Sequence, residues 1–380
     1  MQESRRFGAQ TVPGTHTSVT LEPSRRSRMY LSTLAIGRDN NYTLLRLVAA
    51  LAVIVSHGFA IVLGGSQHEP WRATVGITPG GLAVDVFFVI SGFRVTRSLD
   101  FRRSGSEFVV ARVLRIFPGL LVNLLFVAFL IGPIFSTLSL LDYLDDVQAL
   151  RFVLHNLQML VLPYPAVALP GVTISNGSLW TLPVEVCCYV VLLAGWLAFS
   201  RARKGTAFDG LMALVALLVV AIAGWRYSQT AGFNLAWMFA SGAVFYGLRS
   251  RIRLRASWAV IALLLLAVAS VDRRAFQIAL WVVGPHLVFC AAYLPRERVR
   301  VFNRLGDYSY GTYIYGFPIQ VVVLAIFPSS TVWQHVGVAM TLTLALGILS
   351  WHLVESPALR QAPRVRRRLQ RLFAHRGKCA

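Results

Sequence analysis

Residues 44–63 form an apolar run long enough to cross a bilayer, and this run constrains the fold more than any other feature. Backbone groups inside lipid must be hydrogen-bonded within the segment, so a lone run of this kind has to be a helix. Similar runs recur along a chain that is 56% hydrophobic, with a mean hydropathy of +0.60. The sequence therefore predicts an all-α polytopic membrane protein with about ten transmembrane helices, at residues 43–63, 80–98, 116–136, 179–199, 210–225, 233–248, 257–271, 276–294, 307–327 and 332–354.

The basic residues predict how these spans are oriented. Of the 37 Lys and Arg residues, 29 fall in the two tails and the even-numbered loops, and five fall in the odd-numbered loops. This positive-inside asymmetry places both termini in the cytoplasm. It also accounts for the net charge of +21 without a nucleic-acid partner. The basic clusters at residues 249–255 and 364–371 are either solvated or in contact with anionic membrane lipids.

Three regions follow from this distribution. Residues 1–40 form a polar cytoplasmic tail that we expect to be disordered, residues 41–358 form the membrane domain, and residues 359–380 form a basic cytoplasmic tail. The tail lacks the apolar segment of a cleaved signal peptide, so the first span is expected to direct insertion. We find no metal-ligand spacing, no nucleotide-binding glycine motif and no disulfide framework, so no bound cofactor is expected.

Two ionisable residues interrupt the first span. Arg46 and His57 are eleven positions apart, so they share one helix face at a separation of roughly 16 Å along the axis. Counted inward from the outer boundary, His57, Asp85 and Glu185 reach a similar depth of about 9 Å. An imidazole level with two carboxyls predicts a general base and its orienting group. The alternatives are a snorkelling Arg, a packed His and structural hydrogen bonds between helices.

Arginines gather at the opposite, inner side. Arg46, Arg94 and Arg97 lie at a similar inner depth, and Arg112 and Arg115 precede the third span at i, i+3 spacing. Such a cluster fits a polyanionic ligand that arrives from the cytoplasm, although positive-inside charge alone would also explain it.

Two tyrosines at the start of the ninth span are candidate ligand contacts as well. Tyr310 and Tyr313 share one face, so they can hydrogen-bond a ligand in an inner cavity. They can equally belong to the aromatic belt at the membrane interface.

Five blocks in order identify the chain as resembling the acyltransferase 3 family of integral-membrane enzymes that modify bacterial surface glycans and related compounds. The resemblance covers about residues 40–357. The blocks are Arg46 with His57, the Gly-Gly-Leu-Ala-Val-Asp segment at 80–93 with Asp85, Arg112 and Arg115 with Pro118, the Ser-Leu-Trp segment at 176–185 with Glu185, and the Tyr-Ser-Tyr segment at 308–318. One departure is Gly316, where many relatives carry a His, so no catalytic imidazole is assigned to the ninth span.

The resemblance implies transfer of an acyl group, most often acetyl, from cytoplasmic acyl-CoA to a sugar hydroxyl on the far side of the bacterial cytoplasmic (inner) membrane. In that case Arg46, Arg94, Arg112, Arg115, Tyr310 and Tyr313 would bind acyl-CoA, and His57, Asp85 and Glu185 would be catalytic. Ser178 and Trp180 would then position a carbohydrate acceptor such as O-antigen or exopolysaccharide.

A proton-coupled transporter or flippase is the alternative, because the same buried groups serve proton relays. The acceptor, the acyl chain length, a covalent intermediate and the oligomeric state do not follow from the sequence.

Overall fold

The computed structural model describes residues 30–37, 39–102, 104–158, 176–198, 231–294 and 299–368, and within these residues the regular elements are helices. Five helices are long and apolar enough to cross a membrane: α2 (Tyr42–Val62), the continuous helix Gly105–Phe135, α12 (Arg273–Tyr293), α13 (Ser309–Ile326) and the continuous helix Val332–Arg368. The all-α class with membrane-length helices is thereby confirmed. The count of ten spans and the cytoplasmic position of both termini stay predictions.

The remaining helices at predicted spans fall short for different reasons. The helix α3 (Pro79–Arg102) is not among the five although it has 24 residues, and α8 (Thr181–Ala198) and α11 (Ala256–Ala269) are apolar and short. The helix α10 (Ala231–Gly247) corresponds to the predicted span 233–248. The predicted span 210–225 lies outside the described residues.

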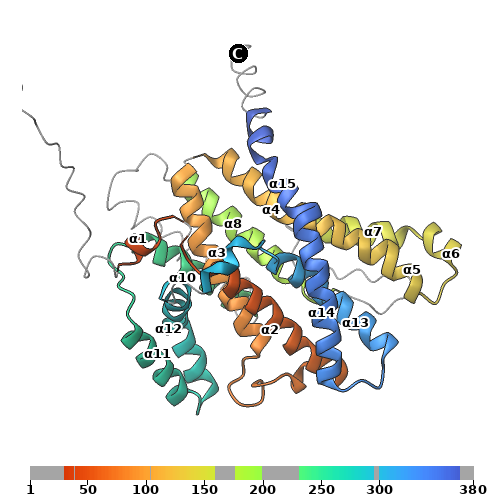
Figure 1. Ribbon diagram of the computed structural model, residues 1–380, viewed down its shortest axis with the longest axis horizontal. Helices are drawn as coiled ribbons and strands as arrows, with labels where there is room; N and C mark the ends of the chain where they lie inside the picture. The colour runs from red at the N-terminus through yellow and green to blue at the C-terminus, as the bar shows by residue number, and fades with distance from the viewer. Residues whose placement is uncertain are drawn as a thin grey trace, which may run out of the picture.

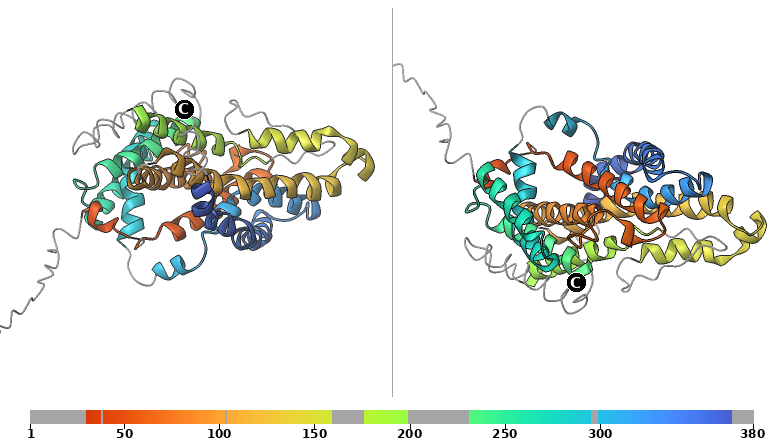
Figure 2. Two further views of the ribbon diagram at one scale, coloured as in Figure 1. Left: turned by 90° about the horizontal axis from the view of Figure 1, so that it is seen from above. Right: turned by 90° about the horizontal axis from the view of Figure 1, so that it is seen from below.

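The bundle is built around α2 and α3, as Figure 1 shows. The helices α10, α11 and α12 cover one side, and α13 and α14 (Val332–Ser350) cover the other. Beyond them, α4 (Gly105–Phe126) continues through η3 (Val127–Ile131) into α5 (Gly132–Phe135). With α6 (Leu140–Asp145) and α7 (Val147–Leu157) it forms an arm that stands out from the bundle in all three views (Figures 1 and 2).

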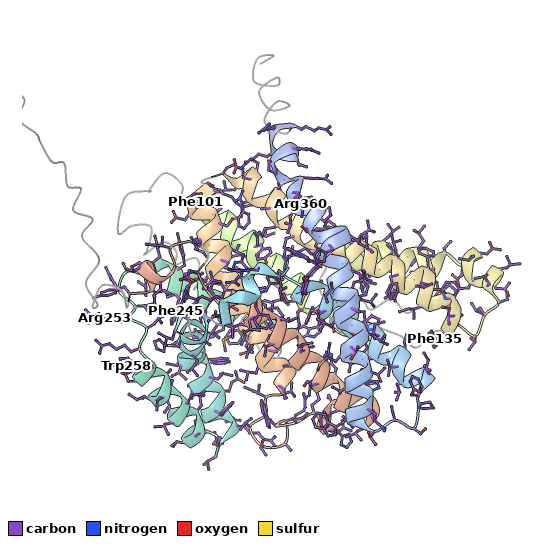
Figure 3. All side chains as sticks on the ribbon, viewed as in Figure 1. Phe101, Phe135, Phe245, Arg253, Trp258 and Arg360 are labelled. Atoms are coloured by element: carbon purple, nitrogen blue, oxygen red, sulfur yellow. The ribbon has the colours of Figure 1, made fainter. Side chains whose placement is uncertain are left out.

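Side-chain exposure follows this arrangement. Trp258 points away from the bundle on the outer helix α11 and is 54% exposed (Figure 3). Phe245 of α10 instead stacks on Phe289 of α12 inside the bundle, with the ring centroids 5.0 Å apart. The apolar surface that α11 exposes is expected to face lipid, because large exposed apolar patches mark interaction or membrane surfaces.

Two glycines allow α3 and α10 to cross at close range. A Cβ at Gly92 would lie 2.0 Å from the carbonyl oxygen of Phe239, and a Cβ at Gly242 would lie 2.1 Å from that of Val89. Small residues that let backbones touch are the usual basis of helix packing in membranes. Gly92 and Gly242 therefore hold α3 close against α10 and determine the depth of α3 in the bundle.

The directions of α2, α3, α13 and α14 determine where the candidate site lies. Arg46 of α2 reaches Asp307 just before α13, and a Cβ at Gly58 would lie 3.4 Å from Gln320 of α13, so α2 and α13 run parallel. A Cβ at Gly80 of α3 would lie 2.9 Å from the Ser56 Cβ, which makes α3 antiparallel to α2. The helix α14 then returns antiparallel to α13 after a short turn.

The expected tails are partly structured at their inner edges. The short helix α1 (Leu31–Leu34) lies within the predicted N-terminal tail, yet Leu31 is fully buried and its amide donates to Ile252 at 2.9 Å. At the other end, α14 continues through η5 (Trp351–Glu355) and α15 (Ser356–Arg360) to residue 368. Helical residues therefore occur on both sides of residues 41–358, and the division into a membrane domain and two cytoplasmic tails stays a prediction.

Candidate active site

Four arginines form a cluster at the α15 end of the bundle, and two of them are held by carboxylates. We call Arg46, Arg94, Arg112 and Arg115 the arginine cluster. Arg46 lies 2.5 Å from the Asp307 Oδ2 atom, and Arg115 donates to the same atom at 2.8 Å. Arg115 also reaches Glu355, whose side chain is 1% exposed, at 3.2 Å. These ion pairs tie α2, α4 and η5 to the start of α13.

Asp307 is the centre of this arrangement. It lies just before the membrane-length helix α13, and its second carboxylate oxygen accepts a hydrogen bond from the Ser309 hydroxyl at 2.6 Å. Burial by itself would raise the pKa of this carboxyl, but Arg46 and Arg115 outweigh burial and hold the pKa below its ordinary value. Asp307 is therefore ionised at neutral pH and binds both guanidinium groups.

The other two arginines of the cluster have no carboxylate partner among the described residues. Arg94 lies over the Tyr42 ring at 6.0 Å, and Arg112 lies over the Tyr189 ring at 5.7 Å. Arg94 is exposed to solvent although it interacts electrostatically with the three other arginines. The Nε atom of Arg112 is buried, and no described residue hydrogen-bonds it. Like charges held this close favour a polyanion between them.

The predicted tyrosines contact the cluster through their rings. Arg115 lies over the Tyr310 ring at 5.6 Å, and the Tyr310 hydroxyl donates to the Ile116 carbonyl oxygen at 2.7 Å. The Tyr313 hydroxyl donates to the Ser178 carbonyl oxygen at 2.8 Å and lies 2.7 Å from the Thr181 hydroxyl. Both hydroxyls are thus used by the protein itself, which favours a structural role over direct ligand binding.

Glu185 belongs to the arginine side of the protein. Its carboxylate accepts hydrogen bonds from the Ser91 hydroxyl at 2.7 Å and from the Tyr189 hydroxyl, which in turn lies beneath Arg112. The depth count misplaced it because the preceding segment does not start at the outer boundary. Asn176 donates to the Ile314 carbonyl oxygen at 3.0 Å, so this segment already lies deep between α4 and α13.

His57 lies at the far end of α2, away from the cluster. Its ring meets the edge of Phe317 of α13 at a centroid distance of 5.5 Å, so Arg46 and His57 both face α13. The Nδ1 atom of His57 is buried and has no hydrogen-bond partner within the residues that the structure describes. The carboxylate that acts on it electrostatically is Glu69, which accepts a hydrogen bond from the neighbouring Ser56. The structure therefore places Glu69, rather than Asp85 or Glu185, beside the imidazole.

Asp85 lies in a separate polar network with α10 and α12. It accepts a hydrogen bond of 2.5 Å from Asn234, whose amide oxygen accepts from Gln277 at 3.0 Å and from Trp281 at 2.5 Å. Because Ser56 lies opposite Gly80, Asp85 lies about six residues, or roughly 9 Å, deeper than His57. Hence the structure does not bring the three predicted catalytic residues together.

The two predicted acceptor contacts differ in exposure. Ser178 is 1% exposed and its hydroxyl has no hydrogen-bond partner in the described part of the chain, whereas Trp180 is 41% exposed. A Cβ at Gly177 would lie 2.7 Å from the Phe317 ring, and the same ring contacts His57. This segment therefore lies across Phe317 from the imidazole.

Three acids that matter in the structure were not assigned from the sequence. Asp307 is part of the polar start of the ninth span, Glu355 directly follows the tenth span, and Glu69 lies in the loop after the first. Of these, only Asp307 could have been found from the sequence, since a charged residue in an otherwise aromatic segment needs a partner.

A cluster of arginines and a buried imidazole thus lie at opposite ends of one parallel helix pair in a protein with membrane-length helices. Residues 39–352 match the family model described as "Acyltransferase domain", so the chain belongs to the acyltransferase 3 family and is an acyltransferase.

Two relatives are similar over most of their length. The chain is 29% identical to the O-acetyl transferase of Shigella phage Sf6, over 86% of this chain and 98% of that protein. It is 30% identical to nodulation protein 10 of Rhizobium leguminosarum bv. viciae, over 85% of this chain and 94% of that protein. No solved structure matches the chain.

Proposed function

We propose that the protein transfers an acyl group, with acetyl as the first choice, from acyl-CoA to a hydroxyl of a cell-surface carbohydrate such as O-antigen or exopolysaccharide. The observation that carries the proposal is the parallel pair of α2 and α13. Arg46 of the arginine cluster and His57 share the face of α2 that meets α13, roughly 16 Å apart along the axis. The similarity to an O-acetyl transferase supports acetyl transfer to oxygen.

Each end of the helix pair has its own chemical role. Arg94 and Arg112, for which the described part of the chain offers no carboxylate partner, bind the phosphates of acyl-CoA, while Arg46 and Arg115 are kept in place by Asp307. The pantetheine arm then runs along α2 and α13 and brings the thioester to His57. With this polarity the α15 end faces the cytoplasm, in the inner membrane of a bacterium.

His57 acts as the general base of this reaction. It removes the proton of the acceptor hydroxyl as the hydroxyl oxygen attacks the thioester carbonyl, and Glu69 stabilises the imidazolium that forms. In this mechanism Glu69, rather than Asp85 or Glu185, orients the His57 imidazole. Asp85 instead joins α3 to α10, and Glu185 supports Tyr189 beneath Arg112.

The test uses purified protein in detergent or in vesicles without an ion gradient, with acetyl-CoA and surface glycan as substrates. Mass spectrometry should detect one acetyl unit added to the glycan, and His57→Ala should abolish this addition while the protein stays abundant and inserted. Normal product from His57→Ala would contradict the general-base role. Transfer that required an ion gradient would instead support the transporter alternative.

A further inference from the structure

Two polar side chains that the proposed mechanism does not use lie fully buried between α13 and α14. Gln320 of α13 and His335 of α14 are both 0% exposed. Among the described residues, neither amide atom of Gln320 and neither ring nitrogen of His335 has a hydrogen-bond partner. Buried polar groups are nearly always paired, and leaving them unpaired lowers stability. Such groups in a native protein call for a functional explanation.

Both side chains lie next to the imidazole end of the site. A Cβ at Gly58 would lie 3.4 Å from the Gln320 Oε1 atom and 3.8 Å from the His335 Cδ2 atom, and Gly58 directly follows His57. Gln320 is also one helical turn beyond Phe317, whose ring contacts His57. Three helices, which Figure 1 shows side by side, thus bring His57, Gln320 and His335 to one place.

Their surroundings are apolar. Val336 and Ala339 of α14 and Val323 of α13 are buried around the Gln320–His335 pair, at 4%, 0% and 2% exposure. Electrostatic interactions are strongest where water is excluded, and fixed donors in such surroundings need no reorganisation during a reaction. The amide NH2 of Gln320 and the N–H of a neutral His335 are donors of this kind.

We propose that Gln320 and His335 donate hydrogen bonds to the carbonyl oxygen of the transferred acyl group and stabilise the oxyanion that forms beside His57. The acceptor oxygen bonds to the carbonyl carbon while its proton passes to His57. The carbon–sulfur bond then breaks, and the proton on His57 passes to the departing thiolate to give free CoA. This assignment rests on the proposed acyl transfer and names the groups that stabilise its transition state.

The experiment compares variants that remove or retain a donor with little change in volume. Gln320→Met and His335→Leu remove a donor, and His335→Gln retains one. Thr343→Val is the matched control, because Thr343 is also fully buried on α14, two turns away from His335, and its hydroxyl has no hydrogen-bond partner among the residues described. The kcat and the KM for acetyl-CoA and for the glycan are measured for each, with yield and acetyl-CoA binding as checks of folding.

Gln320→Met and His335→Leu should each lower kcat by about 100-fold or more, with both KM values within about threefold of the wild type. His335→Gln should recover at least about tenfold of the rate lost in His335→Leu, and Thr343→Val should keep its kcat. The donor role is overturned if Gln320→Met or His335→Leu keeps kcat within about threefold, if either raises only the glycan KM, or if His335→Gln is as slow as His335→Leu.

The wild-type assay separates this inference from the proposed function. Should the wild-type protein fail to move acetyl from acetyl-CoA to the glycan, the proposed function itself is refuted. Should it succeed while the donor-removing variants keep their rate, the function stands and only the roles of Gln320 and His335 fall. If one variant loses acetyl-CoA binding, the donor role is decided from the other variant at the same position or from the variant on the partner helix.

Discussion

Arg112 and Arg115 offer a direct comparison, because they are one helical turn apart on α4 but differ in their partners. Arg115 is held by Asp307 at 2.8 Å and by the buried Glu355 at 3.2 Å, whereas Arg112 has no carboxylate partner among the described residues. Removing one member of a buried ion pair leaves an uncompensated charge, which costs about 3–5 kcal/mol. Arg115→Met should therefore lower the free energy of unfolding by about that amount, and Arg112→Met by less than about 1 kcal/mol.

For the binding of acetyl-CoA, the acyl donor, we expect the opposite order, with the larger effect in Arg112→Met. A charged hydrogen bond to a phosphate contributes about 1.5–3 kcal/mol, which corresponds to roughly 10- to 150-fold in affinity. Arg112→Met should accordingly weaken acetyl-CoA binding by that factor and leave the glycan KM unchanged. Thermal unfolding in detergent measures stability, and titration with acetyl-CoA measures affinity.

The result that would refute this reasoning is a similar loss of stability in both variants. It would show that Arg112 is held by the protein as firmly as Arg115 and is not available to a phosphate. An unchanged acetyl-CoA affinity in a stable Arg112→Met protein would equally remove Arg112 from the donor site. Leu114→Ala, between the two arginines on α4, controls for general disturbance of the helix.

Three further predictions concern single positions. Because Arg46 and Arg115 lower the pKa of Asp307, the stability that its carboxylate provides is present above the ordinary Asp pKa of about 4 and is lost as the pH falls. In unfolding measured between about pH 3 and 7, Asp307→Asn should therefore show a smaller loss of stability toward acid pH than the wild type. Asp85→Asn should retain most of kcat, since Asp85 bonds Asn234 rather than His57, and a loss of more than about 100-fold would return Asp85 to the catalytic group. Gly92→Leu should prevent folding, seen as loss of monodisperse protein, because even a Cβ there would lie 2.0 Å from a backbone oxygen of α10; normal yield would contradict the close crossing.

Helical periodicity and hydropathy were sufficient for the parts of the fold that a single segment determines. The predicted span 43–63 corresponds to α2 at Tyr42–Val62, and the span 276–294 to α12 at Arg273–Tyr293. The shared face of Arg46 and His57 also follows from one helix alone, since eleven residues complete three turns. These features depend only on local geometry.

The depth at which residues of different helices meet could not be predicted in the same way. Counting from span boundaries assumed that every helix starts at the membrane surface, but the segment before α8 starts deep between α4 and α13. The crossing at Gly92 and Gly242 determines how far α3 slides along its neighbours, and this moves Asp85 away from His57. Glu69 lies in a loop, where no periodicity indicates which way a side chain faces.

The pairing of α2 with α13 has a consequence for biosynthesis. Arg46 finds Asp307 only after some 260 intervening residues have been made, and His57 likewise waits for Phe317. Membrane segments emerge from the ribosome one after another, at about 5–20 residues per second. For most of translation the nascent chain thus contains Arg46 and His57 without their partners on α13. Under the proposed acyl transfer, a chain released before α13 is complete is expected to be inactive toward thioesters in the cell.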